Sequence, residues 1–156
     1  MRRFIVHIAL LVAGFSARAN VILPNIFANH MVLQRNQPVA IFGSASPGEQ
    51  VSVAFQNQLK TTEADQNGRW KVELKAMPAN AVGQTLTIRG NNTIELKDVL
   101  VGEVWLCSGQ SNMEYQMRKI EKVKTPLKGD YFPKNEVAEA NNSNIRIFLV
   151  RRKFLA

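Results

Sequence analysis

The feature that most constrains the fold is a strict alternation of apolar and polar residues in short runs between residues 20 and 98. The run 51–55 places Val, Val and Phe at alternate positions, and the run 70–74 does the same with Trp, Val and Leu. Successive side chains of a strand point to opposite faces, so each run predicts a strand with one apolar face. No helical period of useful length occurs here, and the region is therefore predicted to be all-β.

Turn-forming residues separate these runs at short intervals. Pro47-Gly48 precedes the run 51–55, and Asn91-Asn92 separates an expected strand at 86–88 from a returning strand at 94–96. Asn67-Gly68, just before the run 70–74, is the strongest hairpin signal because both residue types tolerate positive φ. Short strands at this spacing predict an N-terminal β-sandwich of jelly-roll type over residues 20–98.

The pattern changes at residue 99. Residues 99–107 form a nearly continuous apolar run, which is typical of a strand covered on both faces in a parallel α/β sheet. After Ser111 the apolar period becomes helical, and residues 145–150 again have the composition of a strand. Residues 99–156 are therefore predicted to be the first strand–helix–strand fragment of an α/β domain. The single cysteine, Cys107, is expected to be buried in the first of these strands.

The first nineteen residues have the pattern of a secretory signal peptide. Arg2 and Arg3 precede an apolar stretch over 4–15, and Ala17-Arg18-Ala19 has the form of an A-x-A cleavage site. The mature chain is expected to begin near Asn20 and to be exported to the periplasm, the cell surface or the medium. Once the signal is cleaved, no stable membrane insertion is expected.

The net charge of +8 does not indicate a nucleic-acid partner. The excess of basic residues lies after Met117, whereas residues 20–100 are close to neutral. The basic residues show no interleaving with aromatic side chains, and an exported protein meets little nucleic acid. A solvated surface is the expected role of these charges.

A candidate nucleophile stands in the turn Gly109-Gln110-Ser111. A serine where a buried strand passes into a helix exposes its hydroxyl, and its backbone N–H points toward a developing oxyanion. The same position is favourable for an N-cap, so the residues alone leave a catalytic and a structural role open. The two histidines, His7 and His30, both precede Ser111, and neither completes the usual pair of nucleophile and base.

The segment around this turn resembles the first conserved block of a known family. It reads Asp98-Val-Leu-Val-Gly-Glu-Val-Trp-Leu-Cys-Ser-Gly-Gln-Ser-Asn-Met-Glu114, and it is similar to the nucleophile block of the sialate O-acetylesterase family. Upstream segments resemble the N-terminal β-sandwich of that family, namely residues 23–27, 31–35, 38–43, 47–49 and 65–70. Residues 144–148 resemble a strand just beyond the nucleophile block.

The resemblance implies a carbohydrate O-acetylesterase of SGNH type, with a flavodoxin-like hydrolase domain. Ser111 would be the nucleophile and a backbone oxyanion donor, while Gln110 and Asn112 are candidate substrate contacts. The expected partner is O-acetylated sialic acid or another acetylated glycan, and no metal or cofactor is expected. The Asp-x-x-His block that supplies the family's base has no counterpart in this chain, and neither His30 nor Asp130 is assigned in its place. The chain is therefore expected to be truncated and inactive alone.

Two other functions remain open from the sequence. One is a secreted glycan-binding β-sandwich without catalysis, in which Trp70 would stack on a sugar, although its place in an alternating apolar run favours the core. The other is an acetylesterase that acts on plant polysaccharide. The nucleophile block does not separate the acetylated substrates, because the acetyl group is common to all of them.

Overall fold

A computed structural model describes residues 20–109 and 140–150, and all regular structure within these ranges is β. The seven strands are β1 (Val32–Gln34), β2 (Val39–Ser44), β3 (Gln50–Phe55), β4 (Gln58–Glu63), β5 (Arg69–Leu74), β6 (Asn80–Arg89) and β7 (Thr93–Gly102). The all-β prediction for the first part of the chain is confirmed. The helix expected after Ser111 lies outside the described residues, as does the predicted signal peptide.

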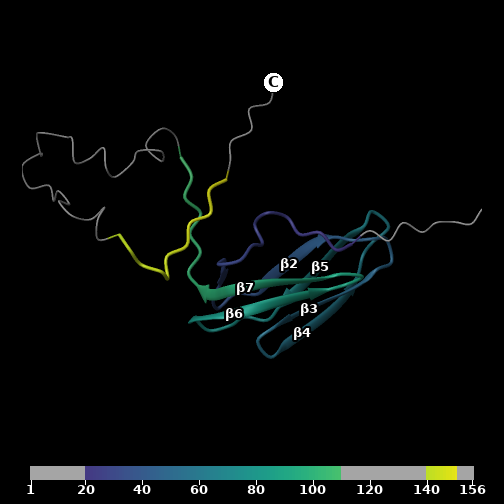
Figure 1. Ribbon diagram of the computed structural model, residues 1–156, viewed down its shortest axis with the longest axis horizontal. Coiled ribbons are helices and arrows are strands. Elements are labelled where there is room, and N and C mark those ends of the chain that lie inside the picture. Colours follow the sequence, from purple (N-terminus) through teal and green to yellow (C-terminus); the bar gives the residue numbers. More distant parts are fainter. Residues whose placement is uncertain (1–19, 110–139, 151–156) are drawn as a thin grey trace, which may run out of the picture.

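The strands form two sheets (Figure 1). One has five strands in the order β1-β7-β6-β3-β4, and the other pairs β2 with β5. All of these pairings are antiparallel except that of β1 with β7, which run parallel. Strands β6 and β7 form the longest pairing and lie inside the larger sheet, between β1 and β3.

Both sheets contribute to one hydrophobic core. The apolar positions of the runs 51–55 and 70–74 are all buried, as the alternation predicts. The largest fully buried side chains are those of Phe55, Ile41, Leu74, Leu86, Ile88, Val51, Val53 and Val99. Removal of this apolar surface from water is the main favourable term for folding. Trp70 belongs to the core and is 3% exposed, so its ring is not available for stacking on a sugar.

The predicted turns form, but one of them connects different strands from those expected. Gly68 has a φ of 70°, and the Asp65 carboxylate accepts the backbone N–H groups of Asn67 and Arg69. The turn does not close a hairpin, because β4 before it pairs with β3 and β5 after it pairs with β2. The local signal predicted the turn correctly, whereas the choice of strand partner depends on the opposite sheet.

Strand β4 was not predicted from the sequence. It lies at the edge of the larger sheet, and its alternate residues are exposed, including its one large apolar side chain, Leu59. An edge strand of this kind buries little apolar surface, so it carries no hydrophobic period to detect. A two-residue turn, in which Gln56 has a φ of 51°, joins it to β3.

The strand expected over residues 99–107 differs from the one observed. Residues 99–101 continue β7, where they are buried and pair with β6 on one side and β1 on the other. The strand ends at Gly102, and the boundary drawn between residues 98 and 99 therefore falls within it. Residues 99–101 of this apolar run are buried and have their partners in the larger sheet, whereas Val104, Trp105 and Leu106 are exposed. The division into domains beyond this strand stays a prediction.

Two further expectations fail for residues that follow β7. Residues 103–109 form no strand, and Cys107 is exposed rather than buried. Residues 145–150 also form no strand, and Ile147 is 89% exposed. A strand needs a neighbour for its backbone N–H and C=O groups, and within the described ranges none lies beside either segment. We call residues 103–109 the outgoing arm and residues 140–150 the returning arm.

Candidate functional site

The predicted site residues Gln110, Ser111 and Asn112 lie outside the described residues. The described chain leads to them through the outgoing arm and resumes in the returning arm. Both arms lie near the C-terminal end of β7 (Figure 1). Contacts at this end of the two sheets, which together we call the β unit (residues 20–102), hold both arms.

Strand β1 anchors the outgoing arm. The Gln34 side chain donates from Nε2 to the Glu103 carboxylate at 3.1 Å and accepts the Val104 backbone N–H at 2.9 Å. The Arg35 backbone N–H donates to the Gly102 carbonyl at 2.9 Å, and its guanidinium pairs with Glu103. Hydrogen bonds from Gln34 and then Arg35 hold the pKa of the Glu103 carboxyl below its ordinary value. The direction in which the chain leaves β7 is thus set by the parallel neighbour strand.

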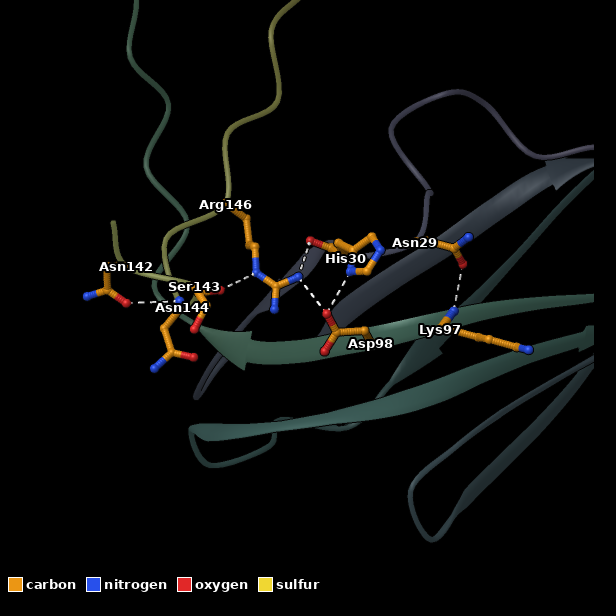
Figure 2. A network of polar contacts seen from close by, with 8 residues as sticks. All are labelled: Asn29, His30, Lys97, Asp98, Asn142, Ser143, Asn144 and Arg146. Atoms are coloured by element: carbon orange, nitrogen blue, oxygen red, sulfur yellow. Dashed lines mark hydrogen bonds and ion pairs between the residues drawn. The ribbon is translucent and has the colours of Figure 1, made fainter. Parts of the chain in front are cut away.

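An arginine ties the returning arm to β7 (Figure 2). Arg146 Nη1 lies 2.8 Å from Asp98 Oδ2 and donates to the His30 carbonyl at 3.3 Å, while Nε donates to the Ser143 carbonyl at 2.8 Å. The Arg146 side chain is only 20% exposed. Every other residue of the arm is exposed. The guanidinium is therefore the main point at which this arm contacts the β unit.

A histidine lies on the other side of the same carboxylate. His30 Nδ1 is 2.6 Å from Asp98 Oδ2, the oxygen that also contacts Arg146 (Figure 2). Backbone bonds hold this histidine beside β7, since its N–H donates to the Lys97 carbonyl and the Lys97 N–H donates to the Asn29 side chain. We call His30, Asp98 and Arg146 the Asp98 cluster.

The backbone around Asp98 departs from regular strand geometry. Between the pairs Leu86–Leu96 and Gln84–Val99, β7 contains one more residue than β6, which makes a bulge at Asp98. Asp98 has a φ of 56°, in the left-handed region that aspartate tolerates better than most residues. On β6, a Cβ at Gly83 would lie 2.0 Å from Asp98 Oδ1. The bulge and the missing side chain at Gly83 together make room for the carboxylate.

The charges of the Asp98 cluster predict how it responds to acid. Hydrogen bonds from Arg146 and then from His30, together with their positive charges, lower the pKa of the Asp98 carboxyl from 3.8, while partial desolvation opposes them. A lowered folded-state pKa means that the cluster's contribution is present above the ordinary aspartate pKa and is lost as the pH falls through the lowered value. The neutral acid would then face two cations.

The lowered pKa of the Asp98 carboxyl can be tested directly by NMR. The titration midpoint of the Asp98 carboxyl carbon is expected below 3.8, and Arg146→Gln is expected to move it upward because the strongest hydrogen-bond donor is lost. His30→Gln is expected to move it in the same direction by a smaller amount. A midpoint that is unchanged in Arg146→Gln would contradict the observed contact.

Sequence reasoning did not find the Asp98 cluster. His30 lies 68 positions before Asp98 in the chain and Arg146 lies 48 positions after it, so no local pattern connects them. The available signal was indirect, because Asp98 begins one of the segments that resemble the family and Arg146 lies in another. The sequence assigned no catalytic role to His30, and the structure places it on the surface beside Asp98.

The described residues contain neither a cluster of three or more metal-ligating side chains of the His, Cys, Asp and Glu types nor a long apolar helix able to cross a membrane. The charged groups near the arms are instead paired with one another.

Comparison with solved structures relates this chain to the esterases. The crystal structure of a carbohydrate acetylesterase from Xanthomonas citri matches with a TM-score of 0.59 and 35% sequence identity, over 67% of this chain and 26% of that one. The present chain is therefore similar to an esterase-type hydrolase in fold and in sequence. No protein-family model matches it.

Curated relatives narrow the comparison. The sialate O-acetylesterase of Mus musculus is 38% identical over 103 residues, and that of Homo sapiens is 35% identical over the same length. Each match covers 59% of this chain but only 19% and 20% of the respective relative. The chain thus contains a sialate O-acetylesterase-like N-terminal portion, and the match spans about a fifth of the length of the relatives.

Proposed function

We propose that this chain is the N-terminal part of a serine esterase that removes acetyl groups from carbohydrates. The observation that carries the proposal is the agreement of two comparisons, since the relatives by sequence and the neighbour by structure are all acetylesterases at 35–38% identity. The proposal includes a jelly-roll-like sandwich over residues 20–98 and an SGNH-type, flavodoxin-like domain that begins in residues 99–156.

The proposed reaction uses Ser111 as the nucleophile. Its Oγ attacks the acetyl carbonyl, the bond to the sugar oxygen breaks, and the sugar leaves with a proton as its free hydroxyl. Water then attacks the acyl-enzyme and releases acetate. The Ser111 backbone N–H stabilises the oxyanion, and Gln110 and Asn112 line the acetyl site. The base and its orienting carboxylate come from an Asp-x-x-His block in the longer protein.

The described residues support this reaction by fixing where the nucleophile segment begins. Glu103 and Val104 are held by the Gln34 side chain, so the outgoing arm leaves β7 in a defined direction. Ser111 follows only a few residues later. A nucleophile has to be held close to the productive geometry, and a rigid β unit beneath it contributes to that placement.

The proposed substrates are acetylated sugars, with O-acetylated sialic acid first. The names of the mouse and human relatives favour sialate esters, whereas the bacterial neighbour is described only as a carbohydrate acetylesterase. An acetylated plant polysaccharide such as xylan is the alternative.

Residues 1–19 are proposed to direct export. N-terminal sequencing of the secreted protein tests this, and the first residue found is expected to be Asn20.

An acetate-release assay tests the proposal. The longer protein that contains this chain is expected to release acetate from an O-acetylated sialoside faster than from acetylated xylan, each supplied at equal ester concentration. A preference for xylan would replace the sialate assignment while keeping the esterase. No acetate above the buffer blank from either substrate would overturn the proposed function. The 156-residue chain alone serves as the control that lacks the base, and we expect it to be inactive.

A further inference from the structure

The returning arm is attached to the β unit mainly by an ion pair. Its apolar side chains point into solvent, and those of Ile147 and Leu149 are 89% and 81% exposed. The hydrogen bonds inside the arm join Asn142 to the backbone N–H groups of Asn144 and Ile145, and Arg146 Nε to the Ser143 carbonyl, so they shape a turn without attaching it to the β unit. Among the described residues, the side-chain contacts that do attach it are those of Arg146 with Asp98 and the His30 carbonyl.

The β unit is shaped to present the carboxylate that receives Arg146. Asp98 and His30 both have left-handed φ values, 56° and 63°, which are unfavourable for residues other than glycine. The Asp98 bulge lies opposite Gly83, where a methyl group would collide with the carboxylate. His30 adds a second contact to the same oxygen and so fixes its direction. Three separate deviations from regular structure thus surround one carboxylate.

The two arms are attached to neighbouring strands of the larger sheet by different acidic residues. Glu103 holds the outgoing arm to β1 just beyond the end of β7, and Asp98 holds the returning arm a few residues earlier along β7. The outgoing arm is therefore held by β1 and the returning arm by β7, and these two strands pair with each other. Loss of the Asp98 contact would free the returning arm and leave the outgoing arm in place.

We propose that Asp98 is a positioning residue, which holds the returning arm through Arg146 and so fixes the frame around the nucleophile segment. Its effect on the reaction rests on the proposed esterase function, whereas its effect on the arm does not. Asp98 does not touch the substrate in this proposal. Asp98 holds the returning arm through its contact with Arg146, and His30 contributes through its contact with Asp98.

The test compares Asp98→Asn with the wild type in the longer protein. Asparagine tolerates positive φ and keeps the shape of the side chain, so the β unit is expected to fold while the ion pair is lost. Amide hydrogen exchange at Asn144 and Ile145, whose N–H groups are bonded to Asn142, is expected to become at least about tenfold faster. The kcat for acetate release is expected to fall about ten- to a hundredfold with a smaller change in KM. Exchange in β3 and β5 is expected to stay unchanged.

Variants of Arg146 supply the rescue test. Arg146→Met is expected to match Asp98→Asn, and the double variant to be no worse than either single one, because both remove the same contact. Arg146→Lys keeps the charge and is expected to restore part of the exchange protection and of kcat. Arg89→Met, a matched change at an exposed arginine at the end of β6, is expected to leave both measurements unchanged.

The outcomes separate the two proposals. Unchanged exchange in Asp98→Asn would overturn the positioning role, and so would faster exchange with an unchanged kcat. A wild-type protein that releases no acetate would overturn the esterase, and the exchange data alone would then show whether Asp98 holds the arm. Faster exchange throughout β3 and β5 would mean that Asp98 stabilises the whole β unit, and this too would overturn the proposal.

Discussion

Ser111→Ala in the longer protein is expected to lower acetate release by about 10⁴- to 10⁶-fold. The reaction as proposed has no other group that can form the acyl-enzyme, and a base without its nucleophile provides little activation of water. The loss is expected in kcat rather than in KM, because alanine leaves the substrate pocket intact. Steady-state acetate release with an O-acetylated sialoside, together with trapping of the acetyl-enzyme by mass spectrometry, measures both effects.

The control for this variant is Ser44→Ala, which removes an exposed hydroxyl from the end of β2 in the smaller sheet. It is expected to keep full activity. Circular dichroism of both variants should match the wild type, which separates loss of chemistry from loss of folding. Turnover by Ser111→Ala within tenfold of the wild type would remove Ser111 from the mechanism, although the esterase assignment would survive with another nucleophile.

Trp70→Ala is expected to lower the free energy of unfolding by about 3–5 kcal/mol. The indole is 3% exposed and lies across the smaller sheet from Gly43, where an added Cβ would come within 2.9 Å of the ring. Removal of the ring leaves a cavity that the strand backbone cannot fill. Denaturant unfolding of the β unit in the full chain, followed by circular dichroism, measures the loss.

Trp70→Phe separates the packing of the ring from its polar group. Within the described ranges the indole Nε1 is buried without a hydrogen-bond partner, so phenylalanine removes an unsatisfied donor along with part of the apolar area. Its cost is therefore expected to be clearly smaller than that of Trp70→Ala. Trp105→Ala, at an 81% exposed position, is expected to stay within about 0.5 kcal/mol of the wild type. A Trp70→Ala protein as stable as Trp105→Ala would contradict the position of the indole in the core.

The sequence alone predicted those parts of the fold in which local pattern and burial agree. The runs 51–55 and 70–74 become β3 and β5 because one face of each is apolar, and the turn at Asn67-Gly68 forms with Gly68 at a positive φ. The resemblance of the chain to the sialate O-acetylesterase family also agrees with the comparisons. These features depend on residues that are close together in the chain.

Other features required the tertiary structure. The partner of β5, the edge strand β4 and the continuation of β7 past residue 98 depend on which sheet a segment joins, and no local period records that choice. The expected strand at 145–150 had the right composition but has no neighbouring strand among the described residues.

The candidate site divides in the same way. Gln110, Ser111 and Asn112 were proposed from a contiguous motif, and their geometry stays a prediction. The contacts of Asp98 with His30 and Arg146 join residues far apart in the sequence, so only the folded chain brings them together. A short motif determines what chemistry a residue can do. Its charge partners are decided by the packing of the sheets, because an ion pair needs atoms within a few ångströms and the sequence specifies no such distance.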